Sequence, residues 1–131
     1  MSYYISTIVQ NKNFDEAIEL VTESLKTEGF GVLTEIDVQG TLKKKIGADF
    51  KKYKILGACN PHFAHKALQA EDKLGILLPC NVVVEEHENG EIEVSAVDPI
   101  VSMSAVNNEN LASLATEVKE KLTKVIDSLK A

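Results

Sequence analysis

The chain has 131 residues, of which 44% are hydrophobic and 26% charged, and its formal net charge is −6. This length predicts a single domain over residues 1–131 that can bury a core without a disulfide or a metal. The acidic balance excludes nucleic acid and an anionic membrane surface as main partners. No basic stretch opens the chain and no apolar run would span a membrane, so we expect a cytoplasmic protein with free cysteines.

The first part of the chain predicts a strand, a helix and a second strand. β-Branched and aromatic residues indicate the first strand over residues 3–9. Asn13, followed three residues later by Glu16, is a capping box that begins a helix, and Gly29 fits the C-terminal cap of that helix. Residues 32–38 then alternate as a strand, with the even-numbered side chains expected on one face.

The rest of the chain predicts three helices and three strands. We expect a short lysine-rich helix over 40–50, a strand over 53–58, a helix over 61–70, and strands over 75–87 and 91–98. A long helix over 108–129 ends the chain. Its apolar side chains are spaced by four and three residues: Leu111, Ala115, Val118, Leu122, Val125 and Leu129. This stripe either lies along the sheet or forms a seam with a second subunit.

The order of elements is strand–helix–strand–helix–strand–helix–strand–strand–helix. It predicts an α+β fold of two layers, in which a mixed or antiparallel sheet carries its helices mainly on one face.

The most informative stretch is Cys59-Asn60-Pro61, where a strand leads directly into a helix. Asn60 is a good N-cap residue, and Pro61 fits the first helical position, where no N–H is needed. Cys59 would then lie at the positive end of the helix dipole, which favours the thiolate. The same free N–H groups could hold an anionic ligand instead. Alternatively, Cys59 is a small buried residue with no chemical role.

A second group of candidate residues comes from the hairpin that Asn89-Gly90 predicts. A two-residue turn at this dipeptide places Asn81 directly opposite Asp98 and turns Cys80 to the other face. Asp98 would then be a carboxylate among apolar side chains, with Asn81 as its hydrogen-bond donor. Alternatively, Asp98 simply ends the strand in a turn, and Pro79 makes a shift of this register by one residue conceivable.

We expect no metal and no cofactor. Cys59, His62 and His65 have a spacing that zinc ligands could use. However, Phe63 and Ala67 define the buried side of their helix, which turns both histidines toward solvent. The sequence also contains no glycine-rich phosphate loop, nucleophile elbow or HExxH motif.

Three segments together resemble the bacterial and archaeal family called domain of unknown function 302. These are the segment KILGACNP at 54–61, the segment GILLPCNVVV at 75–84, and the Asp98-Pro99 dipeptide. The resemblance spans essentially the whole chain. It implies a small α+β domain that forms a dimer and has no established activity. It also implies a set of signature positions without assigning them roles: Cys59, Asn60, Pro61, Pro79, Cys80 and Asp98.

Three functional hypotheses follow from these residues. The first is a module that binds a small anionic or sulfur-containing ligand near Cys59, Asn60, Pro61, Cys80, Asn81 and Asp98. The second is a thiol-based redox or sulfur-transfer protein, with Cys59 as the candidate nucleophile and Cys80 as its partner. The third is a structural or interaction domain without chemistry. We expect a homodimer formed through the C-terminal helix or the sheet, and under the first hypothesis a small molecule as a further partner.

Overall fold

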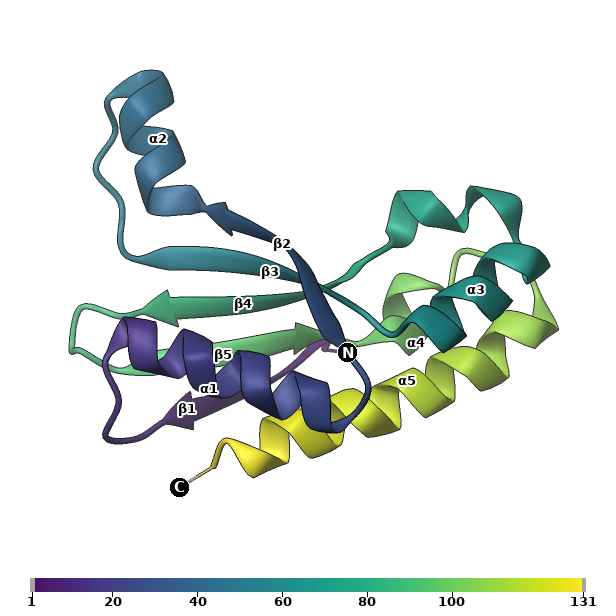
Figure 1. Cartoon of the computed structure of the whole chain (residues 1–131). Coiled ribbons are helices and arrows are strands. Elements are labelled where there is room, and N and C mark those ends of the chain that lie inside the picture. The colour runs from purple at the N-terminus through teal and green to yellow at the C-terminus, as the bar shows by residue number, and fades with distance from the viewer. Residues whose placement is uncertain (1, 131) are drawn as a thin grey trace.

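The computed structural model describes residues 2–130. It has two layers, a sheet and a set of helices (Figure 1), and the sheet has five strands. The strands lie in the order β1-β5-β4-β3-β2, and each is antiparallel to its neighbours. Their bounds are β1 Tyr4–Val9, β2 Gly31–Asp37, β3 Tyr53–Cys59, β4 Cys80–Glu86 and β5 Ile92–Val97. The predicted α+β class is confirmed, with an antiparallel sheet.

The longer helices are α1 Phe14–Thr27, α2 Val38–Ile46, α3 Pro61–Ala70 and α5 Glu109–Ser128. Helices α1 and α5 cover one face of the sheet, while α3 lies beyond the end of β3 (Figure 1). The apolar stripe of α5 is buried within the same chain, and Leu122 at its centre has 0% exposure. The interpretation of α5 as a helix packed on the sheet is therefore confirmed, and the stripe is not free to form a seam with a second subunit.

Several local signals act as the sequence predicts. Asn13 and Glu16 form both hydrogen bonds of the capping box, at 2.8 and 2.9 Å, so α1 begins where expected. Gly29 has φ +84° just past the end of α1, a conformation that glycine adopts without strain. Pro61 is the first residue of α3. These signals fix the ends of the two helices on either side of β2 and β3.

The connection before β4 differs from its prediction. Residues 75–79 do not extend the strand, because Asp72–Leu77 form the 3-10 helix η1 and β4 begins only at Cys80. Pro79 lacks the N–H that a central strand needs, which accounts for this start. A second difference is a register shift between Val32 and Thr34 in β2, which puts Val32 on the face opposite Thr34.

The hairpin between β4 and β5 has a three-residue loop and not the predicted two-residue turn. The His87 N–H donates to the Glu91 carbonyl at 2.8 Å, and Gly90 adopts φ +87° inside the loop. Val82 consequently pairs with Ala96, one position away from the predicted register. A shift of one residue moves every side chain to the other face, so it changes which candidate residues can meet.

Asp98-Pro99 begins one further short helix, α4 Pro99–Ser102, where the sequence suggested only a turn. Within residues 2–130, no helix combines the length and the apolar character needed to cross a membrane.

Candidate functional site

A cavity of about 320 Å³ lies where β3 ends and β4 begins. Its walls come from these strand ends, from α3, from the segment before β4 and from the middle of α5. Most of the lining is apolar, and it includes Phe30, Phe63, Leu78, Met103 and Val118. The same lining contains three of the six candidate ligand-binding residues, Cys59, Asn60 and Cys80, together with the signature residue Pro79. The volume is in the range of pockets that hold small molecules.

Asn60 supplies the clearest polar feature of this cavity. Its side chain does not cap α3 as predicted; instead its Nδ2 donates to the Glu28 carbonyl at 3.4 Å. Asn60 is only 8% exposed, and its Oδ1 has no hydrogen-bond partner within the described chain. A buried oxygen left without a donor costs about 1–3 kcal/mol. Asn60 lines the cavity, so a rotation of its side chain would bring this oxygen within reach of a bound molecule that has an N–H or O–H group.

The orientation of the Asn60 side chain is set by a segment that is distant in the sequence. Gly31 of β2 pairs with Cys59 of β3, so the chain just before β2 passes beside Asn60. A Cβ atom on Gly29 would lie 3.0 Å from Asn60 Nδ2, which shows how closely the two segments approach. The start of α3 is thus left without a side-chain cap.

Cys59 and Cys80 are both free thiols at the rim of the same cavity. Cys80 pairs with Ala58, the residue before Cys59, which puts the two cysteine Cα atoms about 6 Å apart. Successive residues of a strand point to opposite faces, so Cys59 and the Ala58–Cys80 pair face apart. A disulfide between them would require movement of the backbone.

The thiol of Cys80 lies in an apolar environment. Burial, and to a smaller extent the charge of Cys59, raises the pKa of Cys80 from its ordinary 9.0 to about 11. Cys80 is therefore a neutral thiol at physiological pH, with a weak S–H donor and an apolar surface. It suits contact with an apolar or sulfur-containing group better than attack as a thiolate.

Asn81 and Asp98 do not meet, so the predicted pair is wrong. Asp98 continues the buried face of β5, on the same side as Cys80, whereas Asn81 is exposed on the uncovered face of the sheet. The cause is the three-residue hairpin loop, which shifts the register by one position. Pro61 begins α3 but, like Asn81 and Asp98, is not among the residues that line the cavity.

Asp98 instead joins three elements. Its Oδ1 accepts hydrogen bonds from the N–H groups of Ile100 and Val101, which caps α4. Its Oδ2 lies 2.9 Å from Lys119 Nζ of α5. The alternative in which Asp98 organises the turn after the strand accounts for these contacts, because one buried carboxylate satisfies two backbone donors and one cation.

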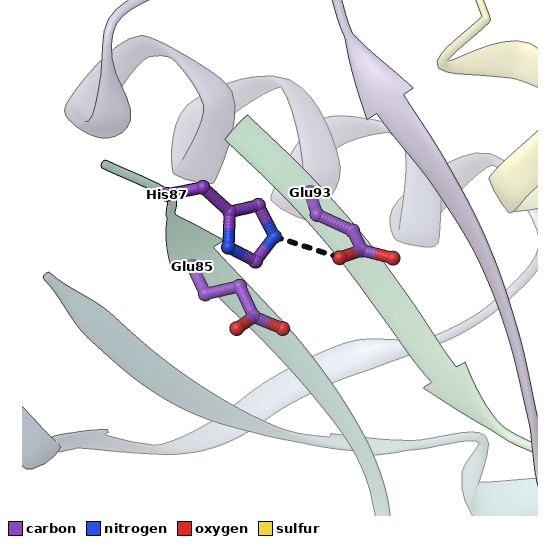
Figure 2. A group of neighbouring side chains, drawn as sticks. All are labelled: Glu85, His87 and Glu93. Carbon is purple, nitrogen blue, oxygen red and sulfur yellow. Dashed lines mark hydrogen bonds and ion pairs between the residues drawn. The ribbon is translucent and has the colours of Figure 1, made fainter. Parts of the chain in front are cut away.

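A second group of polar side chains lies on the uncovered face of the sheet, and the sequence did not predict it. Glu85 of β4 pairs directly with Glu93 of β5, and His87 follows two residues after Glu85 (Figure 2). His87 Nε2 is 2.8 Å from Glu93 Oε1. The spacing of two residues between Glu85 and His87 indicates that both side chains lie on the same face of β4. The predicted two-residue turn, however, paired Glu93 with Glu86 and so hid the cluster.

The histidines of α3 lie where the helical pattern predicts. His62 and His65 are exposed, whereas Ala67 of the same helix is buried. Within residues 2–130, the one group of three potential metal ligands formed by histidine, cysteine and acidic side chains is Glu85, His87 and Glu93.

Comparison with known proteins agrees with this fold. Residues 5–129 match the model of the family described as domain of unknown function DUF302. A crystal structure of an uncharacterized conserved DUF302 protein from Bacillus stearothermophilus superposes with a TM-score of 0.91 at 32% identity, covering 99% of this chain and 100% of that one. No curated protein matches the chain. The chain belongs to the DUF302 family.

Proposed function

We propose that the chain is a small-molecule binding module. Its ligand is a mainly apolar molecule that carries one hydrogen-bond donor or a sulfur-containing group. The observation that carries this proposal is an apolar cavity whose lining includes Asn60, a residue with a buried Oδ1 that has no hydrogen-bond partner in the described chain. Buried polar groups are nearly always hydrogen-bonded, so an orphan acceptor beside a cavity of ligand size favours an occupant that donates.

The lining also indicates how such a ligand would be oriented. Its apolar body would contact side chains such as Phe63, Leu78 and Met103, while its polar end would lie beside Asn60 and the start of α3. No lysine or histidine contributes to the described lining, so an anion would find no positively charged side chain there. This composition favours a neutral or singly charged sulfur-containing molecule over a strongly anionic one.

A thiol-based redox role is the second candidate, and the observation that favours it is that both cysteines border one cavity. Disulfide formation would release two protons and two electrons to an added oxidant such as diamide, which is reduced to its hydrazine. The raised pKa of Cys80 and the opposed directions of the two side chains count against this reaction. Loss of two mass units on oxidation, with both cysteines blocked to alkylation, would support the redox role.

The binding proposal is tested with 1-anilinonaphthalene-8-sulfonate (ANS), an apolar fluorophore with an N–H donor and a sulfonate. We expect saturable enhancement of its fluorescence by the wild-type chain. Ala64→Phe fills the cavity from α3 and should abolish that enhancement. Gln69→Phe adds the same ring to an exposed position of the same helix and should leave the enhancement unchanged.

Folding of each variant is checked by far-ultraviolet circular dichroism and by its melting temperature. Equal ANS binding by the wild type, Ala64→Phe and Gln69→Phe would refute the cavity as the binding site. Absence of saturable binding by the folded wild type would favour the third hypothesis, a structural domain without a ligand.

A homodimer and a cytoplasmic location remain predictions. Of the two surfaces expected to form the dimer, the apolar stripe of α5 is buried in the chain, and the uncovered face of the sheet is the other. Light scattering measures the mass of the particle in solution and decides between monomer and dimer.

A further inference from the structure

We infer that Glu85, His87 and Glu93 form a binding site for a divalent transition-metal ion, separate from the cavity. The sequence alone predicted no metal. The three side chains point toward one another from β4, from the residue just after β4 and from β5, with the helices on the other face of the sheet (Figure 2). One potential ligand atom of each lies within 4.8 Å of those of the other two.

This separation is close to what a metal needs. Two donors that each lie about 2.1 Å from a tetrahedral zinc ion are about 3.4 Å apart. The side chains of His87 and Glu93 are 33% and 26% exposed, so they retain freedom to rotate by the remaining distance. The backbone beneath them is fixed by the strand pairing and by the hydrogen bond from the His87 N–H to Glu91. The site is thus held by rigid elements and closed by small side-chain movements.

The register gives an electrostatic reason for a cation. Glu85 and Glu93 occupy directly opposed positions on neighbouring strands, an arrangement in which like charges destabilise the sheet. Lys51 offsets part of this repulsion, because its Nζ lies 2.6 Å from Glu85 Oε1. A single ion pair that is partly open to solvent contributes little to stability. A divalent ion held by both carboxylates would therefore relieve the repulsion more effectively than one lysine does.

The surroundings leave room for further ligands of the ion. A hollow of about 380 Å³ on the same face is lined by both glutamates together with Tyr3, Tyr53 and Asn81. Three protein ligands with open positions toward a polar hollow are typical of sites where a metal also holds water or a small molecule.

The donor set selects the class of metal. One imidazole nitrogen with two carboxylate oxygens suits zinc or a neighbouring transition metal, whereas magnesium and calcium prefer oxygen ligands alone. The proposed site lies on the uncovered face of the sheet. Cys59 and Cys80 border the other cavity, where β3 ends and β4 begins, so zinc bound by these thiols would occupy a different site.

The test is calorimetric titration of the tag-free chain with zinc chloride. We expect saturable binding of one zinc ion in which Glu85, His87 and Glu93 take part. His87→Gln and Glu93→Gln should each weaken it by about tenfold or more, because each removes one ligand. The matched controls are His65→Gln on α3 and Glu88→Gln in the hairpin loop, both exposed and outside the cluster, and they should bind as the wild type does.

A thermal-shift measurement keeps the inference testable if a variant is less stable. Zinc should raise the melting temperature of the wild type and of both controls, but not of His87→Gln or Glu93→Gln. Unchanged zinc affinity in His87→Gln and Glu93→Gln, or no saturable binding by the folded wild type, would overturn the site. Stronger binding of magnesium than of zinc would overturn the assigned class of metal.

Discussion

The environment of Cys80 predicts how the protein loses stability in alkaline solution. Cys80 is 8% exposed, and burial, with a smaller contribution from Cys59, raises its pKa from 9.0 to about 11. Because the folded-state pKa is higher than the unfolded one, the neutral thiol stabilises the folded chain. That contribution is complete below pH 9.0 and is lost as the pH rises toward 11. At about pH 10.5 the expected loss is about 2 kcal/mol.

The assay is urea unfolding of the wild type and of Cys80→Ala at about pH 8 and about pH 10.5. The other titratable side chains are present in both proteins, so most of their contribution cancels in the difference. We expect the wild type to lose about 2 kcal/mol more free energy of unfolding than Cys80→Ala between the two pH values. The substitution also shortens a cavity-lining side chain, but that cost is the same at both pH values.

Equal losses in the two proteins would refute the reasoning, because they would mean that the Cys80 thiol ionises as easily in the folded chain as in the unfolded one. Cys59→Ala is the matched control. It retains the buried thiol of Cys80, so its loss of stability should stay close to that of the wild type.

Two further substitutions test the packing beside the site by urea unfolding. A Cβ atom on Gly57 would lie 2.8 Å from Pro79 Cγ and closer still to Thr34 Oγ1, so Gly57→Ala should lower the free energy of unfolding by about 1–3 kcal/mol. Gly75 has open space around it, so Gly75→Ala should leave the free energy of unfolding nearly unchanged. Equal effects at the two glycines would contradict the close contact. Asp98→Ala should lower the free energy of unfolding by about 3 kcal/mol, because it removes the cap of α4 and the ion pair to α5. Asp98→Asn should lower it less, because the amide oxygen still accepts the backbone hydrogen bonds. Equal losses in the two variants would contradict the capping role.

The sequence predicts the ends of the helices well, because these depend on local chemistry. The capping box of Asn13 and Glu16, the glycine at position 29 and the proline at position 61 each satisfy or remove backbone groups within a few residues. No distant part of the chain is needed to decide them. The fold class follows from the same signals, since the order of elements leaves few two-layer arrangements.

The register of the hairpin is harder to predict, because Asn89-Gly90 fits both a two-residue and a three-residue loop. One residue of difference separated Asn81 from Asp98 and brought Glu85 opposite Glu93. The predicted cross-strand pairs of the polar residues in β4 and β5 were therefore wrong. The bulge in β2 had the same effect on Val32, and nothing in the local sequence marks it.

The direction of the Asn60 side chain depends on tertiary structure. The residue occupies the position before α3, as its type predicts, but the loop around Gly29 offers its amide a backbone carbonyl from a segment about thirty residues away in the sequence. That contact exists only because β2 and β3 pair. The sequence therefore identifies Cys59, Asn60 and Cys80 as candidates but does not reveal the unpartnered oxygen on which the proposed function rests.

The most direct test of the binding proposal is nuclear magnetic resonance mapping of the ANS site on the ¹⁵N-labelled chain. We predict that the largest amide shift changes will fall at residues around the cavity, including Cys59, Asn60 and Cys80, and that they will vanish in Ala64→Phe. Largest changes at Tyr53, Asn81 and Ser95, on the uncovered face of the sheet, would contradict the account.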